Sequence, residues 1–430
     1  MSITAGISLE EKAAFLRTLP SIRVQCGRVF DLAKEGKLDY FDYYPEKEAD
    51  VADYCIKIMK RDYADFSSIN PHGRWRHLDA GVDRIDPLVS KWASQGVDKK
   101  EESRRLVDLF VVSVLLDAGA GNAWSYKEAS SGQTFTRSEG LGVASVHMFE
   151  SGFFSSDPQQ PYRVDAKGLE KVTPEKTAEI MQVSESNPMV GVEGRASLLY
   201  NLSTALKASP QFFGADGRPG NVVDFLESES QLTGSTRVVP ISALWHALIE
   251  GLNPIWPSRL SLRGVTLGDV WPCSVLKSTA TTEGDDLVPF HKLTQWLTYS
   301  LVEIFQKKLN WKLEGLEDMT GLPEYRNGGL LVDLGVLALK PNALPLDPKS
   351  GLPHAVPSHP AIVEWRAMTV IELDRIADAI RTKLGLTEDQ LSLAVVLESA
   401  TWKGGREIAK ERRPETGGPP IEIESDGTVF

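Results

Sequence analysis

Apolar residues recur at intervals of three and four along most of the chain, which is the spacing of one face of a helix. This pattern predicts helices over 9–34, 46–62, 99–116, 195–208, 221–230, 240–251, 290–308 and 365–384. Stretches that alternate apolar and polar residues, as a half-buried strand does, are scarce. The sequence therefore predicts a mainly α-helical protein with few short strands.

Turn-forming residues interrupt the helical ranges at 117–123, 155–163, 214–220 and 340–360. None of these segments has the length or composition of a disordered linker, and no repeat recurs at a solenoid period. With 430 residues, of which 42% are hydrophobic, the chain can bury a large core. We expect one bilobal helical domain over 1–430, with approximate lobes 1–180 and 181–430.

The balance of charge argues against nucleic acid as a partner. The formal net charge is -12, from 47 basic and 59 acidic residues. Binding to nucleic acid without sequence preference draws most of its affinity from clustered Lys and Arg on phosphates. A small phosphorylated molecule remains compatible with this charge, because a few local cations are enough to hold it.

Cysteine and histidine spacing predicts neither a disulfide framework nor a metal site. Cys26, Cys55 and Cys273 are far apart, and the seven His residues never recur at a spacing of four. The chain does not begin with a basic region followed by an apolar stretch, and the apolar run 109–116 is too short to span a bilayer. We expect a cytoplasmic protein that uses no metal or cofactor and does not enter a membrane.

The motifs of common NTPases, dehydrogenases, zinc proteases and esterases are missing, so candidate chemistry rests on carboxylates and cations. Three short polar islands stand in helical surroundings, at 289–296, 322–329 and 363–367. A charged side chain buried in such apolar surroundings must be paired, hydrogen-bonded or involved in function, because burying it without a partner costs on the order of several kcal/mol. The islands are therefore the first candidates for a site.

The first island opens a helix on which Lys292 and Gln295 share a face that can line a pocket, with His291 at its start. The alternative is that Lys292 lies along the surface of a half-buried helix and that His291 only caps its first turn. In the third island, Glu364 and Arg366 flank a tryptophan at the start of an amphipathic helix, and the alternative there is a buried structural ion pair.

In the second island, Glu324, Tyr325 and Arg326 lie between a proline and two glycines, a usual context for a site on a loop. The alternative is a helix-capping glutamate with an arginine partner.

Weaker candidates lie elsewhere in the chain. Trp124 and Tyr126 follow the glycines of 119–121 and can form a flat wall for a planar ligand, although most such aromatics belong to a core. The cationic and aromatic segment 72–77 is either an anion-binding patch or a solvated turn. Asp117 and Asp426 are further candidate carboxylates, and the latter stands four residues before an apolar end of the sequence.

Along nearly its entire length the chain resembles the uracil catabolism protein 4 family of fungi and bacteria. The matching segments, in order, are 72–79, 115–124, 137–141, 187–195, 267–271, the three islands and 425–430. The resemblance implies a role in a pathway that converts uracil to a nucleotide, opens its ring and releases urea. It also implies the other enzymes of that pathway as partners.

The order of the islands is similar to that in the queuosine salvage proteins, which hydrolyse the N-glycosidic bond of queuosine 5'-phosphate. Those proteins have a bilobal helical fold similar to helix-hairpin-helix DNA glycosylases, and their middle motif carries a catalytic Asp where this chain has Glu324. The resemblance implies catalytic roles for Glu324 and Lys292. It implies substrate-binding roles for His291, Gln295, Tyr325, Arg326, Glu364, Arg366, Trp124, Tyr126, Asp117 and Asp426.

These resemblances favour an N-ribosyl hydrolase that cleaves an opened-pyrimidine riboside such as ribosylurea, or its 5-phosphate, to urea and ribose or ribose phosphate. Its partner would be a small ribosyl or ribosyl-phosphate substrate. One alternative is phosphoribosyl transfer to uracil, for which Glu283, Asp285 and Asp286 supply acids. The other is a non-catalytic partner of another uracil-degradation enzyme.

Overall fold

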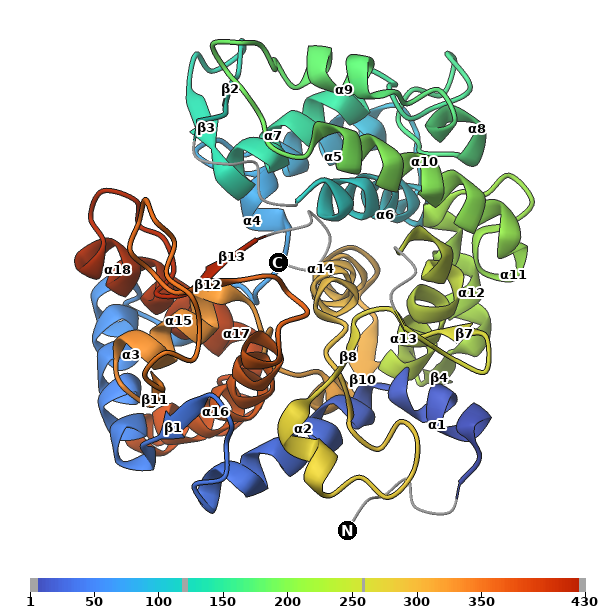
Figure 1. The fold of residues 1–430 in the computed structure, drawn as a ribbon. Helices are drawn as coiled ribbons and strands as arrows, with labels where there is room; N and C mark the ends of the chain where they lie inside the picture. The colour runs from blue at the N-terminus through green and yellow to red at the C-terminus, as the bar shows by residue number, and fades with distance from the viewer. Residues whose placement is uncertain (1–6, 118–122, 257–259, 425–430) are drawn as a thin grey trace. The chain divides into compact units, whose positions relative to one another are not determined.

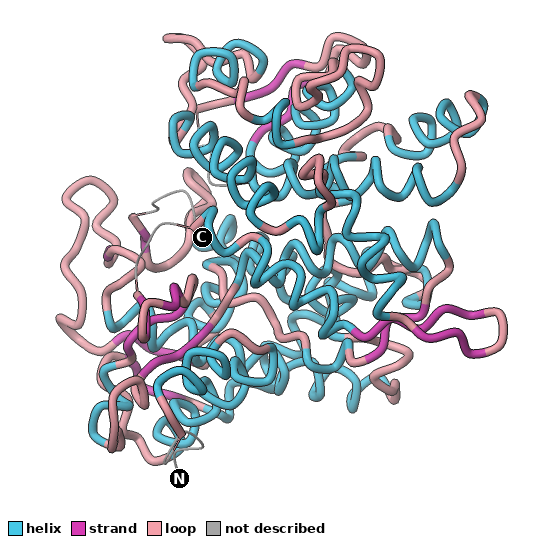
Figure 2. Tube along the Cα trace, turned by 90° about the vertical axis from the view of Figure 1, so that its right-hand side faces the viewer, coloured by secondary structure: helices cyan, strands magenta, loops and turns pink. Residues whose placement is uncertain are grey.

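The computed structural model of the chain describes residues 7–117, 123–256 and 260–424 (Figure 1). Contacts within the chain divide it into two compact units, each assembled from separate segments. Among the described residues, unit 1 comprises 7–72, 260–295 and 317–424, and unit 2 comprises 73–117, 123–256 and 296–316. Helices dominate both units and the strands are short (Figure 2), so the prediction of a mainly α-helical protein is confirmed.

The helices of unit 1 are α1 (Leu9–Leu16), α2 (Leu19–Lys34), η1 (Pro45–Lys47), α3 (Glu48–Asp62), η2 (Phe66–Ser68), η5 (Ser274–Ser278), η6 (Leu316–Asp318), α15 (Tyr325–Asp333), α16 (Pro360–Leu384), α17 (Leu393–Val396), η7 (Leu397–Thr401) and α18 (Trp402–Arg412). Of these, η7 is a π-helical turn. Helix α14 (Lys292–Leu309) has its first turn in unit 1 and the remainder in unit 2.

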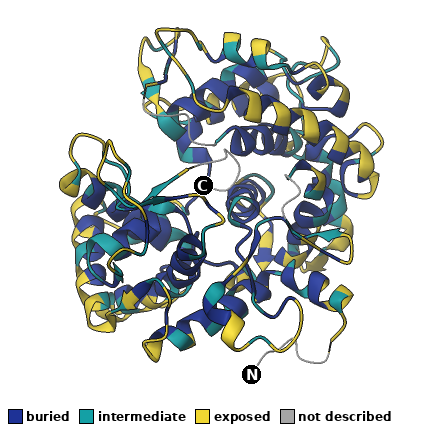
Figure 3. Cartoon of the chain, in the orientation of Figure 1, coloured by how far each residue is buried: buried dark blue, intermediate teal, exposed yellow. Residues whose placement is uncertain are grey.

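Helix α16 forms the centre of unit 1 and packs against α2 and α3. Its residues are buried along most of its length (Figure 3), so it is apolar on more than one face. Pro360 starts the helix because its fixed φ suits the first turn, and Gly385 ends it with a φ of 66°. Helix α15 packs against α18 beside it, and Gly405 allows the close approach.

The predicted helical range 9–34 forms two helices rather than one. Ser8 caps α1 through a reciprocal capping box with Glu11, and α1 ends at Leu16. Pro20, which lacks an amide hydrogen, occupies the first turn of α2. The break follows from the proline, because a continuous helix would need that hydrogen bond.

The strands of unit 1 pair as short two-stranded ladders. They are β1 (Phe41–Tyr43) with β11 (Leu337–Leu339), β6 (Ser261–Leu262) with β7 (Val265–Thr266), β8 (Val270–Pro272) with β9 (Leu287–Pro289), and β12 (His354–Ala355) with β13 (Glu422–Ile423). The β12–β13 pair is parallel and the other three are antiparallel.

Unit 2 contains α4 (Trp75–Leu78), α5 (Ile85–Ser94), α6 (Lys99–Leu116), α7 (Arg137–Glu150), α8 (Ala166–Leu169), α9 (Pro174–Ile180), α10 (Val192–Ala208), α11 (Pro210–Phe213), η3 (Pro219–Asn221), α12 (Val222–Glu229), α13 (Ile241–Gly251) and η4 (Asn253–Ile255). The C-terminal half of α6 is buried along 106–116, and α6 packs against α7, α10 and α12. The apolar run at 109–116 is therefore core.

The strands of unit 2 are β2 (Ser125–Lys127) with β3 (Thr134–Thr136), and a three-stranded sheet in the order β10 (Lys312–Glu314), β5 (Thr236–Pro240), β4 (Gln231–Thr233). In this sheet β4 and β5 form an antiparallel hairpin, and β10 joins β5 in parallel.

Candidate functional site

The β8–β9 ladder of unit 1 brings Asp269 beside the start of α14. Val270 lies opposite Pro289 in the ladder, and the backbone oxygen of Asp269 accepts a hydrogen bond of 2.9 Å from the amide of Phe290. The Asp269 carboxylate accepts a further bond of 3.0 Å from the amide of Lys292. Asp269 therefore satisfies one of the free amides at the start of α14.

Arg366 of α16 forms a two-pronged ion pair with Asp269. Its Nη1 and Nη2 donate to the two carboxylate oxygens at 2.8 Å each, and Trp271 Nε1 donates to one of them at 2.6 Å. Burial alone would raise the pKa of the Asp269 carboxyl. The Arg366 charge and the three donors outweigh that effect and hold the pKa of Asp269 below its ordinary value.

Arg366 also joins the three polar islands to one another. Its guanidinium lies 4.1 Å from the centre of the Phe290 ring in the first island, and its Nε donates to the backbone oxygen of Pro323 in the second at 3.3 Å. Beside it, Trp365 Nε1 donates to the backbone oxygen of Gly328 at 3.0 Å. Segments far apart in the sequence thus meet in unit 1.

Glu324 occupies the N-cap of α15, at the meeting point of the islands. Its two carboxylate oxygens accept hydrogen bonds from the amides of Arg326 and Asn327 at 2.7 and 2.6 Å. The side chain is buried, and this desolvation raises the pKa of the Glu324 carboxyl above its ordinary value, although the two amides and the charges of Lys292 and Arg326 oppose the rise. A buried carboxyl whose pKa is raised is a candidate for a group that exchanges a proton.

His291 and Gln295 serve the frame of the first island. His291 has a φ of 47°, and its Nε2 makes a 2.8 Å hydrogen bond to the backbone oxygen of Leu16. Burial lowers the pKa of the His291 imidazole, which favours the neutral ring. The side-chain nitrogen of Gln295 donates to the backbone oxygen of Phe290 and to the hydroxyl of Thr320, and its side-chain oxygen accepts from the backbone amide of Thr320. Gln295 therefore connects α14 to the segment that leads into Glu324.

Tyr325 and Arg326 open α15 and contact each other. The Arg326 guanidinium lies 4.9 Å from the centre of the Tyr325 ring, and its Nη1 donates to the backbone oxygen of Gly417 at 2.7 Å. Arg326 is buried and Tyr325 is partly exposed. The pair thus borders Glu324 on the side of the C-terminal segment.

Glu364 anchors the start of β1 to α16. Its carboxylate accepts three backbone hydrogen bonds, from the amides of Asp39, Tyr40 and Phe41 at 2.8, 2.9 and 3.0 Å. Burial is the largest effect and raises the pKa of the Glu364 carboxyl to about 7. Its visible contacts are those of a structural anchor.

The remaining candidates of the described chain lie in unit 2. Trp124 is fully buried and its Nε1 donates to the backbone oxygen of Met181 at 2.9 Å. Tyr126 is also buried and stacks on the His147 ring at 6.0 Å between centres. Asp117 pairs with Arg74 at 2.8 Å. Asp426 lies outside the described residues.

Sequence reasoning about the site missed Asp269. It belongs to the segment Leu-Gly-Asp-Val-Trp at 267–271, which contributed only to the family resemblance. The available signal was Gly268, whose φ of 73° marks a turn that leads directly into a buried strand. A carboxylate placed at such a turn is a candidate partner for a buried arginine, but the sequence does not say which one.

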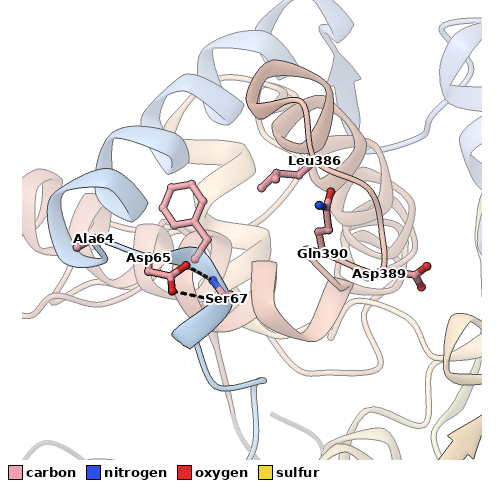
Figure 4. A pocket seen from close by; sticks show the side chains of 7 residues that line it. Ala64, Asp65, Ser67, Leu386, Asp389 and Gln390 are labelled. Atoms are coloured by element: carbon pink, nitrogen blue, oxygen red, sulfur yellow. Dashed lines mark hydrogen bonds between the residues drawn. The ribbon is translucent and has the colours of Figure 1, made fainter.

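None of these candidates lines the pocket of unit 1 shown in Figure 4, which has a volume of about 460 Å³. It is lined by Ala64, Asp65, Phe66, Ser67, Leu386, Asp389 and Gln390. Asp65 bonds both the amide and the hydroxyl of Ser67, so its carboxylate serves its own turn. We assign no chemistry to this pocket.

Asp285, an acid considered for phosphoribosyl transfer, is enclosed in its own loop. It forms a buried ion pair with Lys12 at 2.6 Å and accepts hydrogen bonds from Thr281 and from the amide of Thr282. Its carboxylate therefore organises the loop that holds α1.

Across the described ranges, no three His, Cys, Asp or Glu side chains gather in a way that would hold a metal ion. Within the same ranges, none of the helices combines the length and apolar character needed to cross a membrane.

Comparison with known proteins identifies the family. The family model described as "Protein of unknown function (DUF1688)" matches residues 15–430. The chain is 42% identical to "Uracil catabolism protein 4" of Lachancea kluyveri, over 99% of this chain and 100% of that protein. It is 45% identical to "Protein urg3" of Schizosaccharomyces pombe, over 98% of this chain and 99% of that protein. These similarities cover nearly the whole chain, which therefore belongs to the DUF1688 family.

Proposed function

We propose that this protein acts in uracil catabolism as an N-ribosyl hydrolase. Its substrate would be an opened-pyrimidine riboside such as ribosylurea, or its 5-phosphate, and its products urea and ribose or ribose 5-phosphate. The name of the Lachancea kluyveri relative supports the pathway. The observation that carries the chemistry is the buried Glu324 carboxyl, whose raised pKa and neighbouring Lys292 charge suit a group that moves a proton.

The reaction needs a carboxylate for a definite reason. When the bond between the anomeric carbon and nitrogen breaks, its electron pair goes to the urea nitrogen and the sugar becomes an oxocarbenium-like cation. An adjacent carboxylate stabilises that cation and takes a proton from the attacking water, whose oxygen then bonds to the anomeric carbon. The departing nitrogen gains one proton, so substrate and water together balance urea and the sugar.

Glu324 can cap α15 and take part in this chemistry at once. Each carboxylate oxygen has two acceptor positions, and one backbone amide occupies a position on each oxygen. The amides of Arg326 and Asn327 also fix the direction of the carboxylate, which saves reorganisation during the reaction. In this proposal the cap and the catalytic group are the same side chain.

The cations around Glu324 divide into two roles. Lys292 and Arg326 would hold the 5-phosphate or balance charge in the site. Arg366, whose two terminal nitrogens are engaged by Asp269, would keep the islands in register. His291 and Gln295 would support the same frame through their backbone contacts.

The test is to incubate the purified protein with ribosylurea and with ribosylurea 5-phosphate, and to measure urea and the sugar product together. We expect urea and ribose or ribose 5-phosphate in equal amounts, with no need for diphosphate. Formation of UMP from uracil and phosphoribosyl diphosphate, without urea release, would establish the transferase alternative instead. If neither compound yields urea, even after the other enzymes of the pathway are added, the hydrolase proposal is wrong.

A further inference from the structure

The three-stranded sheet of unit 2 ends in an open edge strand, β4. Among the described strands, β4 pairs only with β5, because the order in the sheet is β10-β5-β4. Its three residues, Gln231, Leu232 and Thr233, are all exposed, as are Gly234 and Ser235 of the turn that follows. Leu232 has an exposed fraction of 66%, the largest of any large hydrophobic residue in the described ranges. The free side of β4 is therefore open to solvent.

The backbone of β4 directs hydrogen-bonding groups toward this free side. Thr233 and Thr236 are opposite each other across a two-residue turn, whose first residue, Gly234, has the positive φ of 66° that such turns require. The pair next to a two-residue turn exchanges backbone hydrogen bonds, so the following pair, Leu232 and Arg237, does not. The amide and carbonyl of Leu232 therefore point away from β5, where another strand can pair with them.

The features that commonly block a sheet edge are missing from β4. Natural edge strands carry a charged residue, a proline or a bulge that prevents pairing with a second chain. The segment 230–236 reads Ser-Gln-Leu-Thr-Gly-Ser-Thr, without charge or proline, and its ladder with β5 is regular. The whole chain has a formal net charge of -12, so two copies repel each other least where they meet through uncharged surface. This edge is such a surface.

The edge is also complementary to itself. When two copies of β4 meet antiparallel at Leu232, the amide of each Leu232 donates to the carbonyl of the other across a two-fold axis. Gln231 then lies opposite Thr233, so a side-chain amide faces a hydroxyl with which it can hydrogen-bond. The two Leu232 side chains lie on one face of the sheet and cover apolar surface of each other. Glu229 lies opposite Ser235, so no like charges oppose each other in this register.

We propose that β4 is a contact between two copies of this chain, which joins their three-stranded sheets into one continuous sheet. The pairing segment, 230–235, is short beside the roughly 20–30 residues that each partner contributes to a standard interface. The dimer is therefore reversible, with a dissociation constant on the order of 100 µM. This interface goes beyond the hydrolase proposal, because it takes part in no step of that reaction.

The test is sedimentation equilibrium of the full chain at physiological ionic strength, over concentrations from about tenfold below to about tenfold above 100 µM. The average mass is expected to rise with concentration from that of one chain toward that of two, because association follows mass action. It should not rise further, because a two-fold contact is satisfied once two copies have met.

Two variants of Leu232 test the contact in different ways. Leu232→Pro removes the outward amide but no hydrogen bond of the hairpin, and proline is tolerated on an edge strand at such a position. It should raise the dissociation constant by about tenfold or more, because each copy loses one hydrogen bond of the contact. Leu232→Lys keeps the backbone and brings two like charges together at the axis, so it should also weaken the dimer. Val190→Lys is the matched control, because Val190 is 63% exposed and lies outside the sheet, and its dimer should equal that of the wild type.

The proposal is overturned if the wild-type protein keeps the mass of one chain at the highest concentration, or if it forms assemblies larger than a dimer. It is also overturned if Leu232→Lys, with the unfolding midpoint of the wild type, dimerises as the wild type does, or if Val190→Lys weakens the dimer equally. None of these outcomes depends on urea release, so failure here and failure of the hydrolase proposal are distinguishable.

Discussion

Replacing Asp269 by Asn should destabilise the protein strongly, because it leaves a buried guanidinium without its counter-charge. Arg366 is 2% exposed, Asp269 is 14% exposed, and two hydrogen bonds of 2.8 Å join them. Breaking a buried pair by removing one charge costs about 3–5 kcal/mol. Since the whole stability of a domain is about 5–15 kcal/mol, the loss is a large fraction of it.

The assay is denaturant unfolding with linear extrapolation to water. The side-chain oxygen of the new asparagine can still accept the hydrogen bond from the backbone amide of Lys292 at the start of α14. The expected loss of stability is therefore not caused by losing that hydrogen bond. The matched control is Glu407→Gln, which removes the partner of Arg61 in an exposed two-pronged pair and should cost below about 1 kcal/mol. If Asp269→Asn costs no more than this control, the pair does not hold the islands together and the reasoning is refuted.

Two further predictions concern buried positions in unit 1. Burial raises the pKa of the Glu372 carboxyl from 4.5 to about 8. The folded state therefore binds this proton more tightly than the unfolded state does. Because of this difference, the stability of the wild-type protein should fall as the pH rises from about 4.5 to 8. Glu372→Gln should flatten that fall, which unfolding at pH 6 and pH 9 measures, and an unchanged slope would contradict it. An added Cβ at Gly405 would lie 2.1 Å from the backbone oxygen of Arg326, so Gly405→Ala should cost about 1–3 kcal/mol. Gly404→Ala, with its nearest neighbour at 3.5 Å, should be tolerated, and equal unfolding midpoints for the two variants would show that the close approach is unimportant.

The helices were largely predictable because their apolar positions are a local signal. The pattern predicted helices at 290–308 and 365–384, and the structure has α14 at Lys292–Leu309 and α16 at Pro360–Leu384. The early start of α16 follows from the proline and from His359, which accepts from the amide of Ala361, rather than from apolar spacing. Boundaries of this kind depend on caps more than on periodicity.

The contacts of the candidate site were not predictable in the same way. A sequence shows that Arg366 carries a charge, but it does not show that the partner is Asp269, because the pairing depends on the folded positions of β8 and α16. Glu364 shows the same difficulty more clearly, because its partners are backbone amides. Every residue other than proline has such an amide, so the sequence does not show which ones Glu364 binds. The polar islands were therefore identifiable as unusual, whereas their partners required the structure.

The most direct test of the central claim is the rate of urea release by Glu324→Gln, compared with wild-type protein and with Glu324→Asp. Loss of a positioned acid or base typically lowers the rate by about 10²–10⁴-fold, so we expect a fall in kcat of at least about 100-fold for Gln. We expect partial activity for Asp, which keeps a carboxylate, and unfolding measurements must show that both variants are folded. A folded Glu324→Gln variant that releases urea at the wild-type rate would contradict the account.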